Sequence, residues 1–271
     1  MKKIFNDEQI AYIKAHYQTM SYSEIAYNLG NYTERQVRGK INGLGLSKLR
    51  KFNNTYFQNI DTPTKAYWLG FLFADGYIIC RPESRNYELG IELQAQDGYI
   101  LQTLSNELGG IHKVAYKSSE KAFNGYHYHT ETSVLRIYSK QIVTDLMNHG
   151  VVPNKTNSEI FPRCSQYLRD FVRGYLDGDG CIYIDYSGVS PHAFVSFTCS
   201  NQDFLTMLQC EIGTAIGILG HIYKENDKKY RLVYFKDSDI PVLLNWIYYD
   251  QTLTMLTRKR DKYNEVLGLA A

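Results

Sequence analysis

The sequence is poor in cysteine, and it lacks both a long hydrophobic run and a strong net charge. Its five cysteines are odd in number and include no C-x-x-C pair, which argues against a disulfide framework and a structural zinc site. The longest apolar run, residues 66–79, is interrupted by Asp75 and is too short to cross a bilayer. The N-terminus reaches Asn6 and Asp7 before any apolar stretch begins, so it does not resemble a secretory signal. These absences predict a cytoplasmic protein with no membrane contact, whose cysteines are small buried apolar side chains.

The formal net charge of +2 is small, with 30 Lys and Arg against 28 Asp and Glu, and taken alone it argues against a nucleic-acid partner. The charge is unevenly distributed along the 271 residues, however. Residues 1–55 contain nine basic and four acidic residues, so this segment carries +5 and the remainder carries −3. The asymmetry predicts a basic module joined to a larger body.

Three short helices are predicted in the first fifty residues. Asn6 offers an N-cap for the first, Ser21 opens the second with Glu24 as its capping-box partner, and Thr33 caps the third. This arrangement resembles a helix-turn-helix DNA-binding domain over residues 1–47, whose third helix would lie in the major groove. The candidate DNA contacts on that helix are Arg35, Gln36, Arg38 and Lys40. A small helical bundle with a solvated basic face is the alternative interpretation.

A pattern repeated at an offset of 104 residues dominates the rest of the chain. Residues 67–76 resemble residues 171–180, and a strand predicted over residues 87–94 falls on residues 191–198. Each copy is predicted as helix, strand, strand, helix, strand, strand, helix. We therefore expect an α+β fold in which two pseudo-symmetric αββαββα half-domains follow the small helical domain.

The domain boundaries follow from this pattern. The first half-domain is expected over residues 63–160 and the second over residues 161–271, with a basic linker over residues 48–62. In the linker, Lys48, Arg50 and Lys51 are further candidate DNA contacts. The strands alternate between apolar and polar residues, so one face of each sheet is buried and the other is exposed. The polar residues expected to face outward are Glu88, Glu92, Gln94, Ser196 and Thr198.

The repeated decapeptides are apolar helices that end at an aspartate and a glycine. The aspartates are Asp75 in the first copy and Asp179 in the second. A carboxylate is unfavourable at the negative end of a helix dipole, so its presence in both copies suggests a bound cation. Small residues four positions apart would let the two helices pack closely: Gly70 and Ala74 in one, Gly174 and Gly178 in the other. Such packing would bring the two aspartates together around Mg²⁺, a site suited to phosphodiester hydrolysis.

These decapeptides resemble the paired motifs of LAGLIDADG homing endonucleases, in the single-chain form with two motifs. The resemblance covers the chain from Asp61 onward. It implies that the motif helices form the interface between the half-domains and that saddle-like antiparallel sheets straddle the major grooves of a long, pseudo-palindromic double-stranded DNA site. It also implies a monomer that cuts both strands with Mg²⁺, with Mn²⁺ as a substitute and Ca²⁺ supporting binding without cleavage. A bacterial or phage gene is the expected source, and an organellar one stays open.

The resemblance also implies roles for individual residues. Asp75 and Asp179 would be the catalytic metal ligands, assisted by the carbonyl groups of Ala74 and Gly178. Lys155 and Lys259 each follow their aspartate by 80 residues and fall where the family often has a basic residue near the scissile phosphate. Gln94 and Gln96 fall near a polar position that orients water in some members. The candidate DNA contacts in the half-domains are Glu88, Glu92, Gln94, Arg136, Ser196, Thr198 and Arg258.

Two other functions are open on the same scaffold. One is a DNA-binding regulator that does not cleave, although both catalytic aspartates are present here. The other is a maturase that assists RNA splicing. One departure between the copies is an acid, Asp177, where the first copy has Phe73, but the family does not use that position as a metal ligand.

Overall fold

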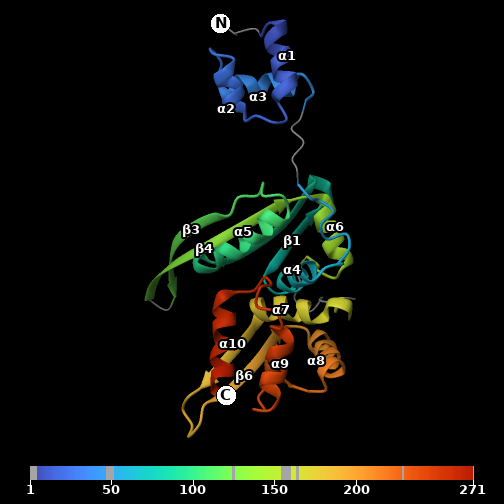
Figure 1. The fold of residues 1–271 in the computed structure, drawn as a ribbon, viewed down its shortest axis with the longest axis vertical. Coiled ribbons are helices and arrows are strands. Elements are labelled where there is room, and N and C mark those ends of the chain that lie inside the picture. The colour runs from blue at the N-terminus through green and yellow to red at the C-terminus, as the bar shows by residue number, and fades with distance from the viewer. Residues whose placement is uncertain are drawn as a thin grey trace. The chain divides into compact units, whose positions relative to one another are not determined.

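The protein divides into two compact units, Met1–Lys51 and Phe52–Ala271, each with its own buried core (Figure 1). The computed structural model describes residues 5–46, 52–123, 126–153, 160–162, 165–227 and 229–270. Within these ranges, no helix combines the length and the apolar character that a membrane crossing requires.

The first unit consists of three helices: α1 (Asp7–His16), α2 (Tyr22–Asn28) and α3 (Glu34–Gly43). Asn6, Ser21 and Thr33 begin the three helices as predicted, and each forms a complete capping box with the residue three positions later. Gly30, with φ of +79°, ends α2 in the left-handed conformation. The apolar sides of the three helices meet in a small core of Ile13, Ile25, Ala26, Val37 and Ile41.

The second unit begins with a half-domain in the predicted order of elements. These are α4 (Pro63–Ala74), β1 (Gly76–Arg81), β2 (Asn86–Gln94), α5 (Gly98–Glu107), β3 (Ala115–Phe123), β4 (Tyr126–Tyr138) and α6 (Lys140–Asn148). Short 3₁₀ turns, η1 (Pro82–Ser84) and η2 (Ala95–Asp97), follow β1 and β2. The four strands form one antiparallel sheet in the order β1-β2-β4-β3.

The other half-domain repeats this architecture after the turn η3 (Ser165–Tyr167). Its elements are α7 (Leu168–Asp179), β5 (Gly180–Asp185), β6 (His192–Cys199), α8 (Gln202–Ile216), β7 (His221–Asn226), β8 (Lys229–Tyr234) and α9 (Asp239–Ile247). Its antiparallel sheet has the matching order β5-β6-β8-β7. The α+β fold with two pseudo-symmetric half-domains is confirmed. One helix that the repeat did not predict, α10 (Thr257–Ala270), follows the second copy.

The inner faces of the sheets hold the core, as the strand alternation predicts. Leu89 and Ile91 of β2 are fully buried, and Glu92 and Gln94 on the other face are exposed. The expectation of an exposed side chain is wrong for Glu88 and Ser196, which are only 7% and 8% exposed. Glu88 is covered because Tyr77 and Arg136 both contact its carboxylate. Ser196 is small and lies on a central strand between Cys181 of β5 and Val233 of β8.

The cysteines agree only in part with the prediction that all are buried. Cys199 is buried and Cys80 is half-buried, but Cys181 and Cys210 are exposed. The four that the structure describes are all free thiols, as the spacing predicted. Cys164 lies outside the described residues.

Candidate active site

The two motif helices, α4 and α7, pack against each other through their glycines in the middle of the second unit (Figure 1). A Cβ atom on Gly70 would lie 2.0 Å from the carbonyl oxygen of Phe171. A Cβ atom on Gly174 would lie 1.9 Å from the carbonyl oxygen of Tyr67. Only glycine permits backbones to approach this closely. The close packing that the spacing of small residues predicted is therefore confirmed.

The C-terminal ends of the two helices bring the candidate metal ligands into one region. Asp75 is the residue that ends α4, and Asp179 is the last residue of α7. A Cβ atom on Gly178 would lie 2.3 Å from Cβ of Ala74 and 3.1 Å from Oδ2 of Asp75. The carboxylate of the first helix thus lies directly against the residue that precedes Asp179 on the second.

A cavity of about 450 Å³ opens beside these helix ends. Six of the candidate residues line it: Asp75, Glu92, Gln94, Gln96, Gly178 and Arg258. Leu93, Asp97 and Thr132 complete the lining. The amide of Gln96 donates a 3.0 Å hydrogen bond to Oε1 of Gln94, so these two side chains are oriented together. The cavity therefore combines three carboxylates, two coupled amides and a guanidinium.

Lys259 of α10 lies buried next to the same helix ends. Its side chain is 6% exposed, and its ammonium group donates a hydrogen bond to the carbonyl oxygen of Gly180. Burial, with a smaller contribution from the charge of Arg258, lowers the pKa of Lys259, and the nearby acids, Asp75 among them, partly offset this. This places a basic group close to Asp75. Its counterpart Lys155 lies outside the described residues.

An ion pair between the half-domains forms part of the cavity wall. Nε of Arg258 lies 3.0 Å from Oδ2 of Asp97, whose side chain is 8% exposed. Next to it, the backbone N–H of Thr257 donates a 2.6 Å hydrogen bond to the hydroxyl of Tyr99. Sequence reasoning missed Asp97 because its partner lies 161 residues away, a separation that no local pattern reveals.

A buried acid, Asp177, holds the segment that leads into α10. Its carboxylate accepts hydrogen bonds from the hydroxyls of Tyr67 and Tyr248, at 2.9 and 3.0 Å, and from the N–H of Leu256 at 2.6 Å. Burial raises the pKa of Asp177 to about 6, although these three hydrogen bonds favour its charged form. Leu256 lies three residues before Lys259, so this network fixes the start of the helix that carries the lysine. In the sequence, the only sign of this hydrogen-bond network was the acid at position 177 where the first copy has Phe73.

Of the described residues, the other candidates do not line this cavity. Arg136 pairs with Glu88 on the outer face of the first sheet, at 3.3 Å. In the first unit, Arg35, Gln36 and Arg38 are exposed on α3 and Lys40 is half-buried. The side chain of Gln36 accepts a hydrogen bond from the N–H of Thr33, so this residue serves the helix cap. Lys48, Arg50 and Lys51 lie outside the described residues.

Comparison with known proteins agrees with this architecture. Residues 166–265 match the model of a LAGLIDADG-like domain. The chain has the LAGLIDADG fold. The homing endonuclease I-WcaI bound to its DNA recognition sequence superimposes with a TM-score of 0.56 at 13% identity, over 83% of this chain and 97% of that one. The K262A mutant of I-SmaMI gives a TM-score of 0.53 at 13% identity, over 76% and 90%.

A curated relative shares sequence over most of its length as well. The uncharacterized protein MJ0398 of Methanocaldococcus jannaschii is 25% identical over an aligned length of 250 residues, and the match covers 85% of this chain and 84% of the relative. The family model covers the second half-domain, and the solved structures extend the likeness to the first. The resemblance of the decapeptides to LAGLIDADG motifs is thus supported by a family match over residues 166–265 and by the shared fold.

The oxygen atoms at the helix ends are of the kind that a hard cation binds, and two carboxylates would supply only part of its coordination shell. Within the described residues, no group of three or more His, Cys, Asp and Glu side chains is arranged to hold a metal ion. Mg²⁺ in proteins is commonly bound by one or two carboxylates together with water and substrate phosphates, not by an all-protein cage. Two aspartates with neighbouring carbonyl groups fit that pattern.

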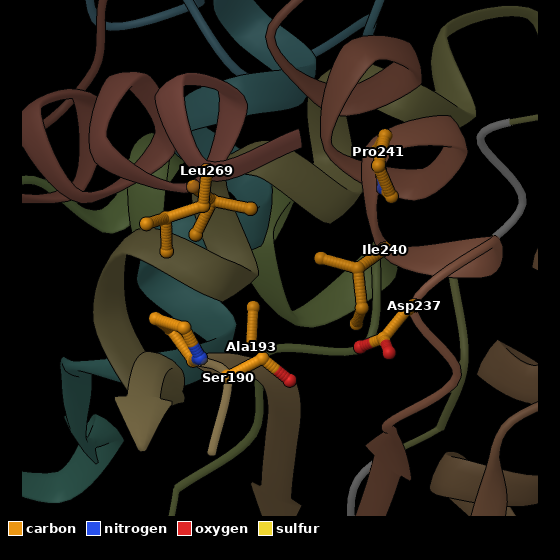
Figure 2. Close-up of a pocket in the computed structure, with 8 residues that line it drawn as sticks. Ser190, Ala193, Asp237, Ile240, Pro241 and Leu269 are labelled. Carbon is orange, nitrogen blue, oxygen red and sulfur yellow. The ribbon is translucent and has the colours of Figure 1, made fainter. Parts of the chain in front are cut away.

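A second cavity of about 250 Å³ lies elsewhere in the LAGLIDADG fold, between the start of β6, α9 and α10 (Figure 2). Six of its eight lining residues are apolar, Ala193, Ile240 and Leu269 among them. Asp237 contributes the one carboxylate of the lining and lies 3.3 Å from Nδ1 of His192. None of the candidate catalytic or DNA-binding residues lines this cavity.

Proposed function

We propose that the protein is a site-specific endonuclease that cuts both strands of double-stranded DNA with the help of a divalent cation. One observation carries the proposal: the α4–α7 contact sets Asp75 against Gly178 of the opposite half-domain, on the wall of a polar cavity. The fold supports it, because I-WcaI, a homing endonuclease bound to its DNA recognition sequence, shares that fold.

In this proposal the two motif helices hold the cation. Asp75 and Asp179 would be its carboxylate ligands, and the carbonyl groups of Ala74 and Gly178 would add to them. Bound there, Mg²⁺ would lower the pKa of a water and stabilise the leaving oxygen of the phosphodiester. Because one chain supplies both aspartates, a monomer would be sufficient.

The residues around the helix ends would position the phosphate. Lys259 supplies a buried positive charge beside Asp75, suited to offset the charge that develops on the phosphate. Asp97 fixes the guanidinium of Arg258 on the cavity wall, where it would contact a phosphate oxygen. Gln94 and Gln96 would hydrogen-bond to DNA or to the attacking water.

The two sheets and the helical unit would bind the DNA. Glu92, Gln94 and Thr198 lie on the outer faces of β2 and β6, and Arg136 lies on β4. Arg35, Arg38 and Lys40 of α3 would add contacts outside the core site. Lys48, Arg50 and Lys51 would contribute positive charge next to that unit. A long, pseudo-palindromic target is the expected partner.

Cleavage of a selected target tests the proposal. DNA sequences bound by the full-length protein are isolated from a randomised library and incubated with protein in Mg²⁺, Mn²⁺ or Ca²⁺. We expect double-strand cleavage in Mg²⁺ and in Mn²⁺, and binding without cleavage in Ca²⁺. Tight binding with no cleavage in any of the three would instead identify a regulator, and the endonuclease would be ruled out.

A further inference from the structure

The hairpin of β3 and β4 in the first half-domain extends farther than its counterpart, β7 and β8, in the second. β2 pairs with β4 only as far as Thr132, and residues 126–131 of β4 continue beyond this point paired with β3 alone. In the second half-domain, β6 pairs with β8 as far as Tyr230, and only Lys229 continues beyond, opposite Asn226. β4 therefore extends beyond its neighbour by six residues and β8 by one, a difference of five. Figure 1 shows this extension, residues 118–123 and 126–131, which we call the arm, projecting past α5.

None of the arm's described side chains belongs to the core. Its described side chains are exposed, apart from the partly exposed Thr130. They include Ser119, Tyr128 and His129, which carry hydroxyl or imidazole groups. A two-stranded hairpin without apolar cover is only marginally stable in water. The extra residues of the arm therefore do not lengthen the hairpin in order to stabilise the fold. An exposed two-stranded ribbon of this kind is suited to binding a partner molecule.

The strand register gives the arm two chemically different faces. Ser119 lies opposite Thr130, and Lys117 lies opposite Thr132, which in turn lies opposite Gln94. Because side chains alternate along a strand, Lys117, Ser119, Tyr128 and Thr130 continue the outer face on which Gln94 lies. Among the described side chains of the arm, this face carries hydroxyl groups and no acid.

The acids of the arm lie on its other face. Glu120 is opposite His129, and Glu131 is opposite Ser118. Two contacts support this assignment: Oγ of Ser118 lies 3.1 Å from Nε2 of His129, and the same nitrogen lies 3.5 Å from the carboxylate of Glu131. The described acids of the arm therefore lie on the face away from the proposed DNA-binding surface, where they would not repel a phosphate backbone.

We propose that the arm extends DNA readout on one side only, so that the target has unequal halves. Five extra residues at about 3.4 Å each span about 17 Å. At about 3.4 Å per base pair, this is about five further base pairs under the first half-domain. The major groove admits a two-stranded ribbon, and Ser119, Tyr128 and Thr130 would meet base edges there. This inference rests on the proposed function.

The sequences selected by the full-length protein in Ca²⁺ test the inference directly. We expect a preferred sequence that extends about five base pairs farther on one side of the centre than on the other. Changing both Tyr128→Ala and Thr130→Ala should relax the preference at the outermost positions of the longer side by about fivefold or more. The matched control changes Glu120→Ala and His129→Ala on the opposite face and should leave the preference unchanged.

Three results would overturn the inference. A preferred sequence with halves of equal length would do so while leaving the endonuclease proposal intact. An equal loss of preference in the control variant would show that the arm acts through its overall shape and not through its outer face. Failure to bind any sequence would remove the proposed function together with the inference. Thermal unfolding of each variant confirms that it is folded before its preference is compared.

Discussion

Asp177 and Phe73 occupy equivalent positions of the two motif helices, but Phe73 packs against aromatic rings whereas Asp177 accepts buried hydrogen bonds. Phe73 is 3% exposed and packs against Phe171 and Phe204, with ring centroids 5.4 and 5.8 Å away. Asp177 is fully buried and accepts three hydrogen bonds, one of them from the backbone of Leu256. The departure from internal symmetry therefore marks the place where the second half-domain attaches its additional helix.

Replacing Asp177 tests how much this network stabilises the protein. Asp177→Ala leaves two tyrosine hydroxyls and one backbone N–H buried without an acceptor, which should lower the free energy of unfolding by about 3 kcal/mol. Asp177→Asn keeps one acceptor oxygen and should cost about half as much. Urea denaturation measures both. The control, Asp227→Ala, removes a carboxylate that is 96% exposed and should change stability by less than about 0.5 kcal/mol. A loss below 1 kcal/mol for Asp177→Ala would contradict the account.

At the scale of elements, the α4–α7 contact depends on glycines that leave no room for a side chain. Gly174→Ala would place a methyl group 1.9 Å from the carbonyl oxygen of Tyr67, so the helices must move apart. We expect the free energy of unfolding to fall by about 2 kcal/mol or more, and cleavage to slow because the helix ends separate.

A matched control is available in α10. A Cβ atom on Gly268 would meet nothing within 4 Å beyond its chain neighbours and the backbone of its own helix, so Gly268→Ala should be neutral or slightly stabilising. Thermal or urea unfolding of the two variants compares them directly. Equal stability of both variants would show that the helix contact does not require glycine at position 174.

The elements that could be predicted from the sequence are those whose signals are local. The repeat at 104 residues, the alternation in strands and the small residues of the motif helices predicted both half-domains and the region around Asp75. The pairing of Asp97 with Arg258 and the network of Asp177 could not be predicted in this way. Their partners lie 161 and up to 110 residues away and are brought together only by the folded chain. Glu88 was misjudged for the same reason, because the side chains that cover it belong to neighbouring strands.

At the scale of the whole molecule, the ion pair of Asp97 and Arg258 joins the half-domains beside the cavity. Its acid is nearly buried and its guanidinium is about half exposed. A double-mutant cycle with Asp97→Ala and Arg258→Ala should give a coupling free energy of about 1 kcal/mol in unfolding. Strictly additive losses would show that the pair does not connect the two halves energetically.

The helical unit has its own core, so it should be separable from the rest. We expect residues 52–271 to unfold cooperatively without it, because the core of this part is complete in itself. Without the basic residues of α3, binding to the selected DNA should weaken by about tenfold or more and depend less steeply on salt. Fluorescence anisotropy over a salt series measures both effects. Unchanged affinity and an unchanged salt slope would show that the unit does not contact DNA.

The most direct test of the endonuclease proposal is the cleavage of a selected target by Asp75→Asn and Asp179→Asn. Each change removes a carboxylate charge from the helix ends while preserving side-chain size, so folding and Ca²⁺-supported DNA binding should persist. We predict that each variant loses double-strand cleavage in Mg²⁺ by about 100-fold or more, since several kcal/mol of transition-state stabilisation would be lost. Double-strand cleavage at the wild-type rate by either variant would contradict a catalytic centre shared between α4 and α7.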